Sequence, residues 1–396
     1  MGAWAGLLWS ALAMNSKGTT LYFDNNATTP VDPEVLDAMM PYLREHYGNA
    51  SSVYGIGKLA ARAIEEARER VASALGCEAG EVVFTSCGTE SSNAAIHSAL
   101  LVDRDRQHIV TTRVEHSATL KTCEVLAKRG YEITWLGVDR EGRLDLEELR
   151  DAIRDDTALV SVMWANNETG VVFPLEEIAA LTRERSVFLH TDAVQVIGKL
   201  PVNLAALGLQ FLSLSGHKLH CPKGIGALYV NRKCRFTPFL SGGGQEGGRR
   251  AGTENVPYIV ALGKACEIAV RRIEAERVEV RALRDAFETG VMSAVSGVVV
   301  NGDVENRLPN TTSLSFEGVD AETLLLLLDQ GGLCCSAGSA CTSGSIHPSH
   351  VLKAMGMSDD RARSSLRFSF SRFNTRAEVE RGVSMVVGLV GKIRAG

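Results

Sequence analysis

The chain has 396 residues, of which 45% are hydrophobic and 22% charged, and both fractions are close to those of globular proteins. This composition excludes an intrinsically disordered chain, a collagen-like repeat and a membrane protein with many spans. The formal net charge is -5, from 42 Lys and Arg against 47 Asp and Glu, so electrostatics gives no reason to expect nucleic acid or a membrane as a partner.

The cysteine content and the N-terminus bear on the compartment. Nine cysteines, an odd number, are scattered along the chain, which favours a reducing environment, and we expect a cytoplasmic protein. The stretch GAWAGLLWSALAM is too short to span a bilayer, and its first basic residue is Lys17, so it lacks the pattern of a signal peptide. We expect residues 1–20 to form an extension outside the fold.

From about residue 30 the pattern is strand, turn and helix, repeated. Asp32 before Pro33 is typical of an N-cap and a first-turn proline, and a second helix is expected from about Lys58 to Leu75, ending at Gly76. Seven apolar runs follow, mostly separated by helical stretches: EVVFT, HIVTT, YEITWL, ALVSVMW, VFLHT, LQFLSLS and GALYV. This alternation predicts a large α/β domain over residues 30–265, with a mostly parallel seven-stranded sheet.

The C-terminal part of the chain has a different pattern. A long charged helix is expected from about Ala265 to Thr289, followed by the strands VSGVVVN and TTSLSF and a helix around Leu324. The strand SSLRFSF and a final helix complete the chain. Because strands and helices are segregated here, the pattern predicts a small α+β domain over residues 266–396.

Two polar side chains follow neighbouring apolar runs and together indicate a cofactor. Lys218 ends the turn SGHK, and Asp192 ends the run VFLHTD, so both are placed at the carboxyl ends of strands, where open α/β sheets bind ligands. Alone, Lys218 is typical of a surface lysine and Asp192 of a helix cap. As a pair they fit pyridoxal phosphate (PLP), which needs a lysine for a Schiff base and a carboxylate at its pyridine nitrogen. Gln195 is then placed to donate to the phenolic oxygen of the ring.

A phosphate site is predicted in EVVFTSCGTESSNAAI, a strand, a tight turn and a helix. Gly88 and Thr89 begin the helix, where free N–H groups and the helix dipole favour an anion, although the same residues are also typical of a plain helix start. Ser215 and His217, beside the expected lysine, are candidates for the same phosphate. His116 follows another strand, and its imidazole is a candidate for stacking on the cofactor ring.

Cys341 lies in CCSAGSACTSGSIHPSH, a Gly- and Ser-rich segment without periodicity that predicts a loop with an accessible thiol. A metal site is the alternative, with the ligands drawn from Cys334, Cys335, Cys341, His347 and His350. The spacing fits no paired C-x-x-C site, and adjacent cysteines chelate one ion poorly, so we expect no metal.

Arg367 is the one basic residue of the apolar strand SSLRFSF. An arginine in such a place either forms a structural ion pair or offers its guanidinium to the carboxylate of a substrate. The sequence leaves both alternatives open.

Taken together, these blocks resemble the PLP-dependent cysteine desulfurases of the NifS/IscS class. The resemblance runs from about Tyr22 to the last helix, and WANNETG, SLSGHKLHCPKG and RRAGTEN look closest to the nitrogen-fixation NifS branch. It further includes YFDNNATTP, GNASSVYG, VEHSA, HTDAVQ, NRLPNT, GSACTSGS and RFSFSRF. The resemblance implies PLP-dependent transferase fold type I, as in class V aminotransferases, with a small domain built from residues 21–29 and 266–396. It also implies a homodimer.

The resemblance also assigns roles to individual residues. Lys218 would form the Schiff base, His116 would stack on the ring and assist proton transfer, and Cys341 would be the nucleophile. Arg367 and Asn49 would hold the substrate carboxylate. Cofactor contacts are implied for Gly88, Thr89, His116, Asn167, Asp192, Gln195, Ser215, His217 and Lys218, joined by Thr253 from the neighbouring subunit.

The activity implied is conversion of L-cysteine to L-alanine, with the sulfur left as a persulfide on Cys341. An iron–sulfur scaffold protein would be the acceptor, with nitrogenase maturation as the destination. A selenocysteine lyase, or another PLP lyase that does not use Cys341, stays open as an alternative. A non-catalytic assembly platform would be expected to have lost Lys218 or Asp192, and both are present.

Overall fold

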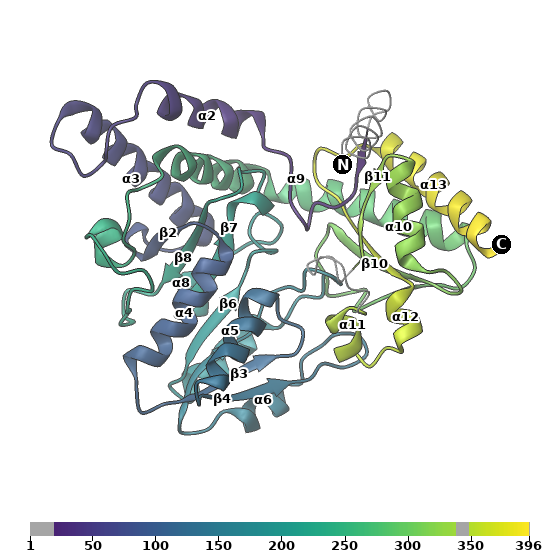
Figure 1. The fold of residues 1–396 in the computed structure, drawn as a ribbon, viewed down its shortest axis with the longest axis horizontal. Coiled ribbons are helices and arrows are strands. Elements are labelled where there is room, and N and C mark those ends of the chain that lie inside the picture. The colour runs from purple at the N-terminus through teal and green to yellow at the C-terminus, as the bar shows by residue number, and fades with distance from the viewer. Residues whose placement is uncertain (1–19, 338–347, 396) are drawn as a thin grey trace, which may run out of the picture.

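A computed structural model describes residues 20–337 and 348–395. A seven-stranded sheet is the centre of the larger part of the chain (Figure 1). In order across the sheet, its strands are β2 (Val82–Thr85), β8 (Gly226–Val230), β7 (Phe211–Ser215), β6 (Phe188–Asp192), β5 (Thr157–Ser161), β3 (His108–Thr112) and β4 (Glu132–Leu136). Strand β8 is antiparallel to both of its neighbours, and every other neighbouring pair is parallel. The predicted mostly parallel seven-stranded sheet is confirmed.

Helices cover both faces of this sheet, because neighbouring residues of a strand point to opposite sides. In β3, for example, Val110 packs into the core on one face and Ile109 into the core on the other. The Ile109 face is covered by α4 (Gly88–Val102) and α5 (Ser117–Lys128). The Val110 face is covered by α2 (Pro33–Arg44), α3 (Gly55–Leu75), α6 (Leu146–Ala152), α7 (Leu175–Glu184), α8 (Leu204–Leu207) and the first half of α9 (Val256–Ala294).

The ends of the first two helices follow from their capping residues. The Asp32 side chain accepts a hydrogen bond from the Glu34 amide at 2.8 Å, with a proline at the first position of α2, as predicted. Helix α3 ends at Gly76, whose φ of +63° is a left-handed conformation that glycine adopts without strain. It begins at Gly55, three residues before the predicted start, because glycines weaken the helical signal there.

A second, four-stranded sheet is built from the C-terminal part of the chain. Its strand order is β12 (Ser336–Ala337), β13 (Ser365–Ser369), β10 (Thr311–Phe316) and β9 (Val298–Val300). The N-terminal strand β1 (Leu21–Tyr22) lies beside this unit and pairs with β11 (Leu333–Cys334). The helices of this part are α10 (Ala321–Gln330), α11 (His350–Ala354), α12 (Asp359–Arg363) and α13 (Arg376–Ala395).

Helix α9 connects the two packing units and is longer than predicted. It begins at Val256, with a proline in its first turn, and runs to Ala294 (Figure 1). Its buried hydrophobic side chains up to Ile268 belong to the core of the large sheet, whereas Val280, Phe287 and Val291 belong to the second core. The predicted division at residues 265 and 266 therefore falls inside one helix, and it stays a prediction.

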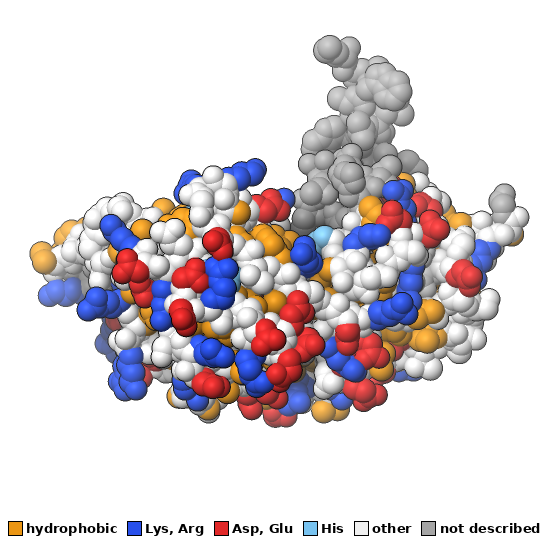
Figure 2. Space-filling model, turned by 90° about the horizontal axis from the view of Figure 1, so that it is seen from below, with side chains coloured by type: hydrophobic (Ala, Val, Ile, Leu, Met, Phe, Trp, Pro, Cys, Tyr) orange, Lys and Arg blue, Asp and Glu red, His pale blue; other side chains and the backbone are white. Residues whose placement is uncertain are grey.

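The surface of the described residues carries mixed charge. On the face seen in Figure 2, acidic and basic side chains are interspersed rather than gathered by sign. Within residues 20–337 and 348–395, no helix has the length and apolarity needed to cross a membrane. The predicted N-terminal extension lies outside the described residues, except for its last residue.

A close approach between α3 and α9 gives a test of this packing. A Cβ on Gly263 would lie 2.6 Å from the Ala67 Cα, so the two helices would have to separate. We expect Gly263→Ala to lower the free energy of unfolding by about 1–3 kcal/mol, as measured by urea unfolding. Gly388→Ala in α13 is the matched control, because a Cβ there meets no atom within 4 Å. The control should be neutral or stabilising by about 0.4–1 kcal/mol, and equal losses in both variants would contradict the helix contact.

Candidate active site

A cavity of about 510 Å³ lies at the carboxyl ends of β6 and β7. This volume is in the range of small-molecule and cofactor sites. Of the predicted site residues that the structure describes, all except Asn49 and Thr253 line it: Gly88, Thr89, His116, Asn167, Asp192, Gln195, Ser215, His217, Lys218 and Arg367. Residues separated by up to 279 positions in the sequence (Gly88 to Arg367) are thus brought to one site.

The N-terminus of α4 forms one end of this cavity. Helix α4 begins at Gly88, and its N-cap Cys87 makes no side-chain capping hydrogen bond, so the helix N-terminus is available to an anion. A Cβ on Gly88 would lie 2.8 Å from the Val194 side chain, so glycine is needed for this close approach. Ser215 and His217 line the same cavity, and these donors fit the phosphate of PLP.

His217 is a neutral donor rather than a charge. Burial, followed by the positive charge of Lys218, lowers the pKa of His217 to about 4. Its Nδ1 lies 3.2 Å from the Thr28 hydroxyl, in the segment that follows β1. The positive field at this end of the cavity therefore comes mainly from the helix N-terminus and from Lys218.

Asp192 ends β6 and is buried at the floor of the cavity. Its Oδ1 accepts a hydrogen bond from the Val194 amide at 2.9 Å. Burial raises the pKa of Asp192, while His116 in its protonated form and the positive charge of Lys218 act in the opposite direction. A cationic ring N–H placed against this carboxylate would stabilise its ionised form, and this chemistry fits the pyridine nitrogen of PLP.

His116 is held in one orientation by the backbone. It is the N-cap of α5, and its Nδ1 accepts a hydrogen bond from the Ala118 amide at 3.1 Å. The neutral ring consequently carries its proton on Nε2. Burial lowers the pKa of His116, although Asp192 raises it, so the imidazole is neutral near physiological pH and is available for stacking or proton transfer.

Lys218 ends η2 (Gly216–Lys218), the turn that follows β7. Its Nζ donates to the carbonyl oxygens of Asn26 and Ala27, each at 2.6 Å. The Asn26 oxygen also accepts from Nε2 of Gln195 at 3.0 Å. A segment from the N-terminal end of the chain thus positions the lysine and the glutamine together.

Arg367 forms an ion pair in this structure. Its Nη2 lies 2.6 Å from Oδ1 of Asp24, and its Nη1 donates to the Asn167 carbonyl at 2.9 Å. Asp24 also accepts from the Ser336 hydroxyl at 2.9 Å. Of the two alternatives left open by the sequence, the ion pair is present, and the guanidinium also lines the cavity, so a contact with a substrate carboxylate stays a prediction.

Asn49 and Thr253 do not line this cavity. Asn49 is exposed, and its side chain accepts a hydrogen bond from the Ser51 amide at 2.9 Å. Thr253 is also exposed and lies at a separate cavity with Thr85 and Arg250. The role of Asn49 and the contact of Thr253 with the neighbouring subunit's cofactor stay predictions.

Cys341 lies outside the described residues. The described chain before it ends at Ala337, which lines the cavity. Beyond it, the Ser349 hydroxyl donates to Glu168, and Nε2 of His350 lies 3.0 Å from the Glu115 carbonyl oxygen. Of the two cysteines that precede Ala337, Cys335 is buried in the second core. Among the described residues, no group of three His, Cys, Asp or Glu side chains is arranged to hold a metal ion.

Sequence reasoning missed Asp24, Asn26 and Glu115. Asp24 and Asn26 belong to YFDNNATTP, whose run of polar residues directly after a short apolar stretch was the available signal. Glu115 precedes His116 and is buried; its Oε1 accepts from the Met163 amide and the Thr112 hydroxyl. Its Oε2 is buried and has no hydrogen-bond partner among the described residues.

Glu115 predicts a dependence of stability on pH. Burial raises the pKa of Glu115 to about 8, above the 4.5 of a free side chain. Between pH 4.5 and about pH 8, Glu115 is therefore protonated in the folded chain but ionised in the unfolded chain. The stability from this proton is complete below about pH 4.5 and is lost as the pH rises to about 8. Relative to the natural chain, Glu115→Gln should gain stability with rising pH, by up to about 1.4 kcal/mol per pH unit.

Thermal unfolding over this pH range measures the effect. Glu124→Gln is the matched control, because Glu124 lies on the surface of the neighbouring helix α5 and pairs with Lys121. Its difference from the natural chain should stay constant with pH. A constant difference for Glu115→Gln as well would show that Glu115 is ionised in the folded protein.

The aminotransferase class-V family matches residues 21–381. The chain belongs to this family. It is 50% identical over 377 residues to the cysteine desulfurase of Trichormus azollae, covering 95% of this chain and 94% of that protein. It is 49% identical over 375 residues to the cysteine desulfurase NifS of Azotobacter vinelandii, covering 94% and 93%. Among solved structures, a NifS-like protein is 37% identical with a TM-score of 0.89, over 94% of this chain and all of that one.

These similarities place the chain with the cysteine desulfurases of the class-V family. The expected fold class and the resemblance to the NifS proteins are confirmed. The similarity extends over nearly the whole length of the relatives, so it includes both sheets and α9 as well as the cavity.

Proposed function

We propose that this protein is a cysteine desulfurase that converts L-cysteine to L-alanine with PLP as its cofactor and passes the sulfur on as a persulfide of Cys341. The observation that carries the proposal is the meeting of Lys218, Asp192 and the N-terminus of α4 in one cavity. A lysine, a buried carboxylate and an anion site are the three features that PLP requires. The 50% identity to named cysteine desulfurases supports the choice of reaction.

The cofactor would be held at both ends and on one face. Asp192 would face its ring nitrogen, Gln195 and Asn167 its phenolic oxygen, and His116 its ring face. When bound, PLP supplies an electron sink for negative charge at the substrate Cα. The phosphate would be held by Gly88, Thr89, Ser215 and His217, with Thr253 from the neighbouring subunit.

The chain itself supplies proton transfer and sulfur uptake. Lys218 would hold the cofactor through its Nζ and would be the base placed to take the substrate Cα proton, with neutral His116 as its partner. Arg367 would orient the substrate carboxylate. The Cβ–sulfur bond of cysteine breaks as a sulfur–sulfur bond forms at Sγ of Cys341, and a proton completes alanine. One thiol and one cysteine therefore give one persulfide and one alanine.

We infer that the protein works as a homodimer in the cytoplasm and delivers sulfur to an iron–sulfur scaffold protein, with nitrogenase maturation as the destination. The loop between α2 and α3 supports a dimer. Its large hydrophobic side chains are exposed, with 75% of Tyr47, 85% of Val53 and 53% of Tyr54 accessible in the single chain. Such a patch is typical of an interface.

Incubation of the purified, PLP-loaded protein with L-cysteine and a reducing thiol tests the activity. We expect alanine and sulfide to appear in equal amounts, because each turnover removes one sulfur atom. Release of selenium from L-selenocysteine, with no alanine from L-cysteine, would support a selenocysteine lyase instead. No turnover of either amino acid by protein with the absorbance of bound PLP would refute both activities.

A further inference from the structure

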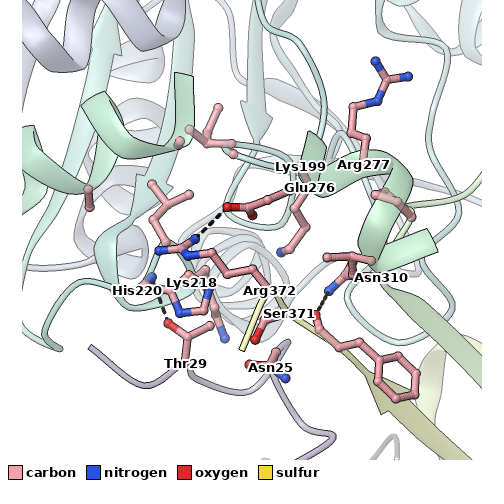
Figure 3. Close-up of a pocket in the computed structure, with 18 residues that line it drawn as sticks. Asn25, Thr29, Lys199, Lys218, His220, Glu276, Arg277, Asn310, Ser371 and Arg372 are labelled. Atoms are coloured by element: carbon pink, nitrogen blue, oxygen red, sulfur yellow. Dashed lines mark hydrogen bonds and ion pairs between the residues drawn. The ribbon is translucent and has the colours of Figure 1, made fainter. Parts of the chain in front are cut away.

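A second, smaller cavity lies behind the candidate active site. Its volume is about 40 Å³, and Lys218 lines both cavities. Figure 3 shows the side chains of Lys199 and of Glu276 at this second cavity, which Arg277 of α9 also lines. The half-buried Lys199 follows Gln195 by four residues in the turn after β6.

Lys199 is hydrogen-bonded to Gln195 twice. Its Nζ donates to Oε1 of the Gln195 side chain at 3.0 Å and to the Gln195 backbone carbonyl at 3.0 Å. On the other side of the amide, Nε2 of Gln195 donates to the Asn26 carbonyl at 3.0 Å. That carbonyl also accepts from Lys218. A continuous set of hydrogen bonds therefore connects Lys199 to the lysine of the active site.

The hydrogen-bonding groups of Lys199 and Gln195 determine which way the side-chain amide of Gln195 is turned. A lysine ammonium has three donors and no acceptor, so it can hydrogen-bond only to the oxygen of a side-chain amide. With Oε1 held in this way, Nε2 must face the opposite side, where Asn26 and the active-site cavity lie. Without Lys199, the direction of the amide would rest on the single hydrogen bond from Nε2 to the Asn26 carbonyl.

We propose that Lys199 is a positioning residue of the active site, which holds Oε1 of Gln195 and thereby directs the Nε2 donor toward Asn26 and the cofactor. The inference rests on the proposed function, because the oriented donor matters only if the cavity holds PLP. Lys199 itself lies outside the active-site cavity: it lines the small second cavity and acts on the active site through Gln195.

The charged groups around Lys199 make this contact sensitive to pH. Burial, followed by the positive charges of Lys218 and Arg367, lowers the pKa of Lys199 to about 7, and Glu276 opposes them. Arg277, Arg372 and His220 line the same cavity (Figure 3). Arg372 is paired with Asp32 and Glu276, and burial keeps His220 neutral with a pKa of about 3. A neutral amine can also accept a hydrogen bond, so the direction of the amide is enforced most strongly below about pH 7.

A double-mutant cycle tests the proposal. The dissociation constant of PLP is measured by absorbance titration of cofactor-free full-length protein, for the natural chain, Lys199→Met, Gln195→Ala and the double variant. We expect Lys199→Met to weaken binding about 2- to 10-fold, the scale of one misplaced hydrogen bond. When Gln195 is already alanine, Lys199→Met should change the logarithm of the PLP dissociation constant by less than about half as much as it does in the natural chain, because the amide that Lys199 holds is absent.

The pH profile separates positioning from a merely structural role. The effect of Lys199→Met should be larger at about pH 6 than at about pH 9, since Lys199 is charged only at the lower value. Equal effects at both values, or in both backgrounds, would overturn the proposal. Lys121→Met is the matched control, because Lys121 is exposed and pairs with Glu124 on the surface of α5, and it should leave PLP binding unchanged.

A second variant covers the case in which Lys199→Met does not fold. Gln195→Glu keeps the oxygen that Lys199 holds but has no Nε2 donor, so it should fold and still bind PLP about 2- to 10-fold more weakly. Binding equal to that of the natural chain would overturn the proposal. If the natural chain itself binds no PLP, the proposed function fails; if it binds PLP and the variants do not differ, only the role of Lys199 fails.

Discussion

Replacing Lys218 with alanine is expected to reduce alanine formation from L-cysteine by at least about 10²–10⁴-fold, the contribution of a positioned proton-transfer group. The loss should be larger than this if the covalent bond to PLP is also required. Lys218 ends the turn after β7, and its Nζ lies 2.6 Å from two backbone carbonyl oxygens that hold it at the cavity. Single-turnover and steady-state alanine assays measure the effect.

Lys218→Arg separates the chemistry of the amine from its structural contacts. Arginine keeps the positive charge and the donors for the Asn26 and Ala27 carbonyls, but its guanidinium stays protonated and does not form a Schiff base. We expect this variant to fold and to bind PLP without the absorbance of a covalently bound cofactor. Retention of more than about a tenth of the activity by Lys218→Arg would contradict the role of Lys218 as the reacting amine.

The fold was largely predictable because its strands are buried on both sides of the sheet. Strands such as β5 and β7 are entirely buried, so they appear in the sequence as short continuous apolar runs between turns. Asp192 and Lys218 were predictable for the same reason, since each directly follows such a run and parallel neighbours end at the same edge.

The contacts across the cavity were not predictable from local patterns. Asp24 and Arg367 are 343 residues apart, and Asn26 and Lys218 are 192 apart, so neither pair leaves a spacing that could be recognised. The orientation of Gln195 depends equally on Asn26, which lies on a different segment from Lys199. Such groups are positioned by the tertiary fold, and the sequence indicates only that polar residues occur near strand ends.

The domain boundary within α9 could not be located from the sequence for a different reason. The proline in the first turn of α9 is compatible with a helix start. Between Ile268 and Val280 the helix passes from one hydrophobic core to the other, and the charged sequence there gives no signal of this change. The sequence predicted a boundary near residue 265, where a long charged helix was expected to begin. A helix shared by two cores has no break at such a point, because its backbone hydrogen bonds continue while its buried face changes partner.

Replacing Cys341 with alanine is expected to lower the release of alanine and sulfide from L-cysteine by at least about 100-fold, because the variant has no thiol to take up the sulfur. The described chain ends at the cavity four residues before it, at Ala337, and Ser336 contacts the Asp24 carboxylate that pairs with Arg367. PLP binding should be unchanged, since none of the residues proposed to hold the cofactor is altered. This combination of full PLP binding and lost turnover distinguishes a nucleophile from a residue needed for folding.

Cys334→Ala is the matched control for the loss of a thiol. Cys334 lies in β11 and pairs with Tyr22 of β1, and it does not line the cavity. We expect it to keep turnover, and we expect mass spectrometry after one turnover of the natural chain to find one added sulfur atom on the peptide that contains Cys341. If Cys341→Ala still converts L-cysteine at the natural rate, sulfur must leave the substrate without transfer to that thiol, and the reaction would be that of a lyase.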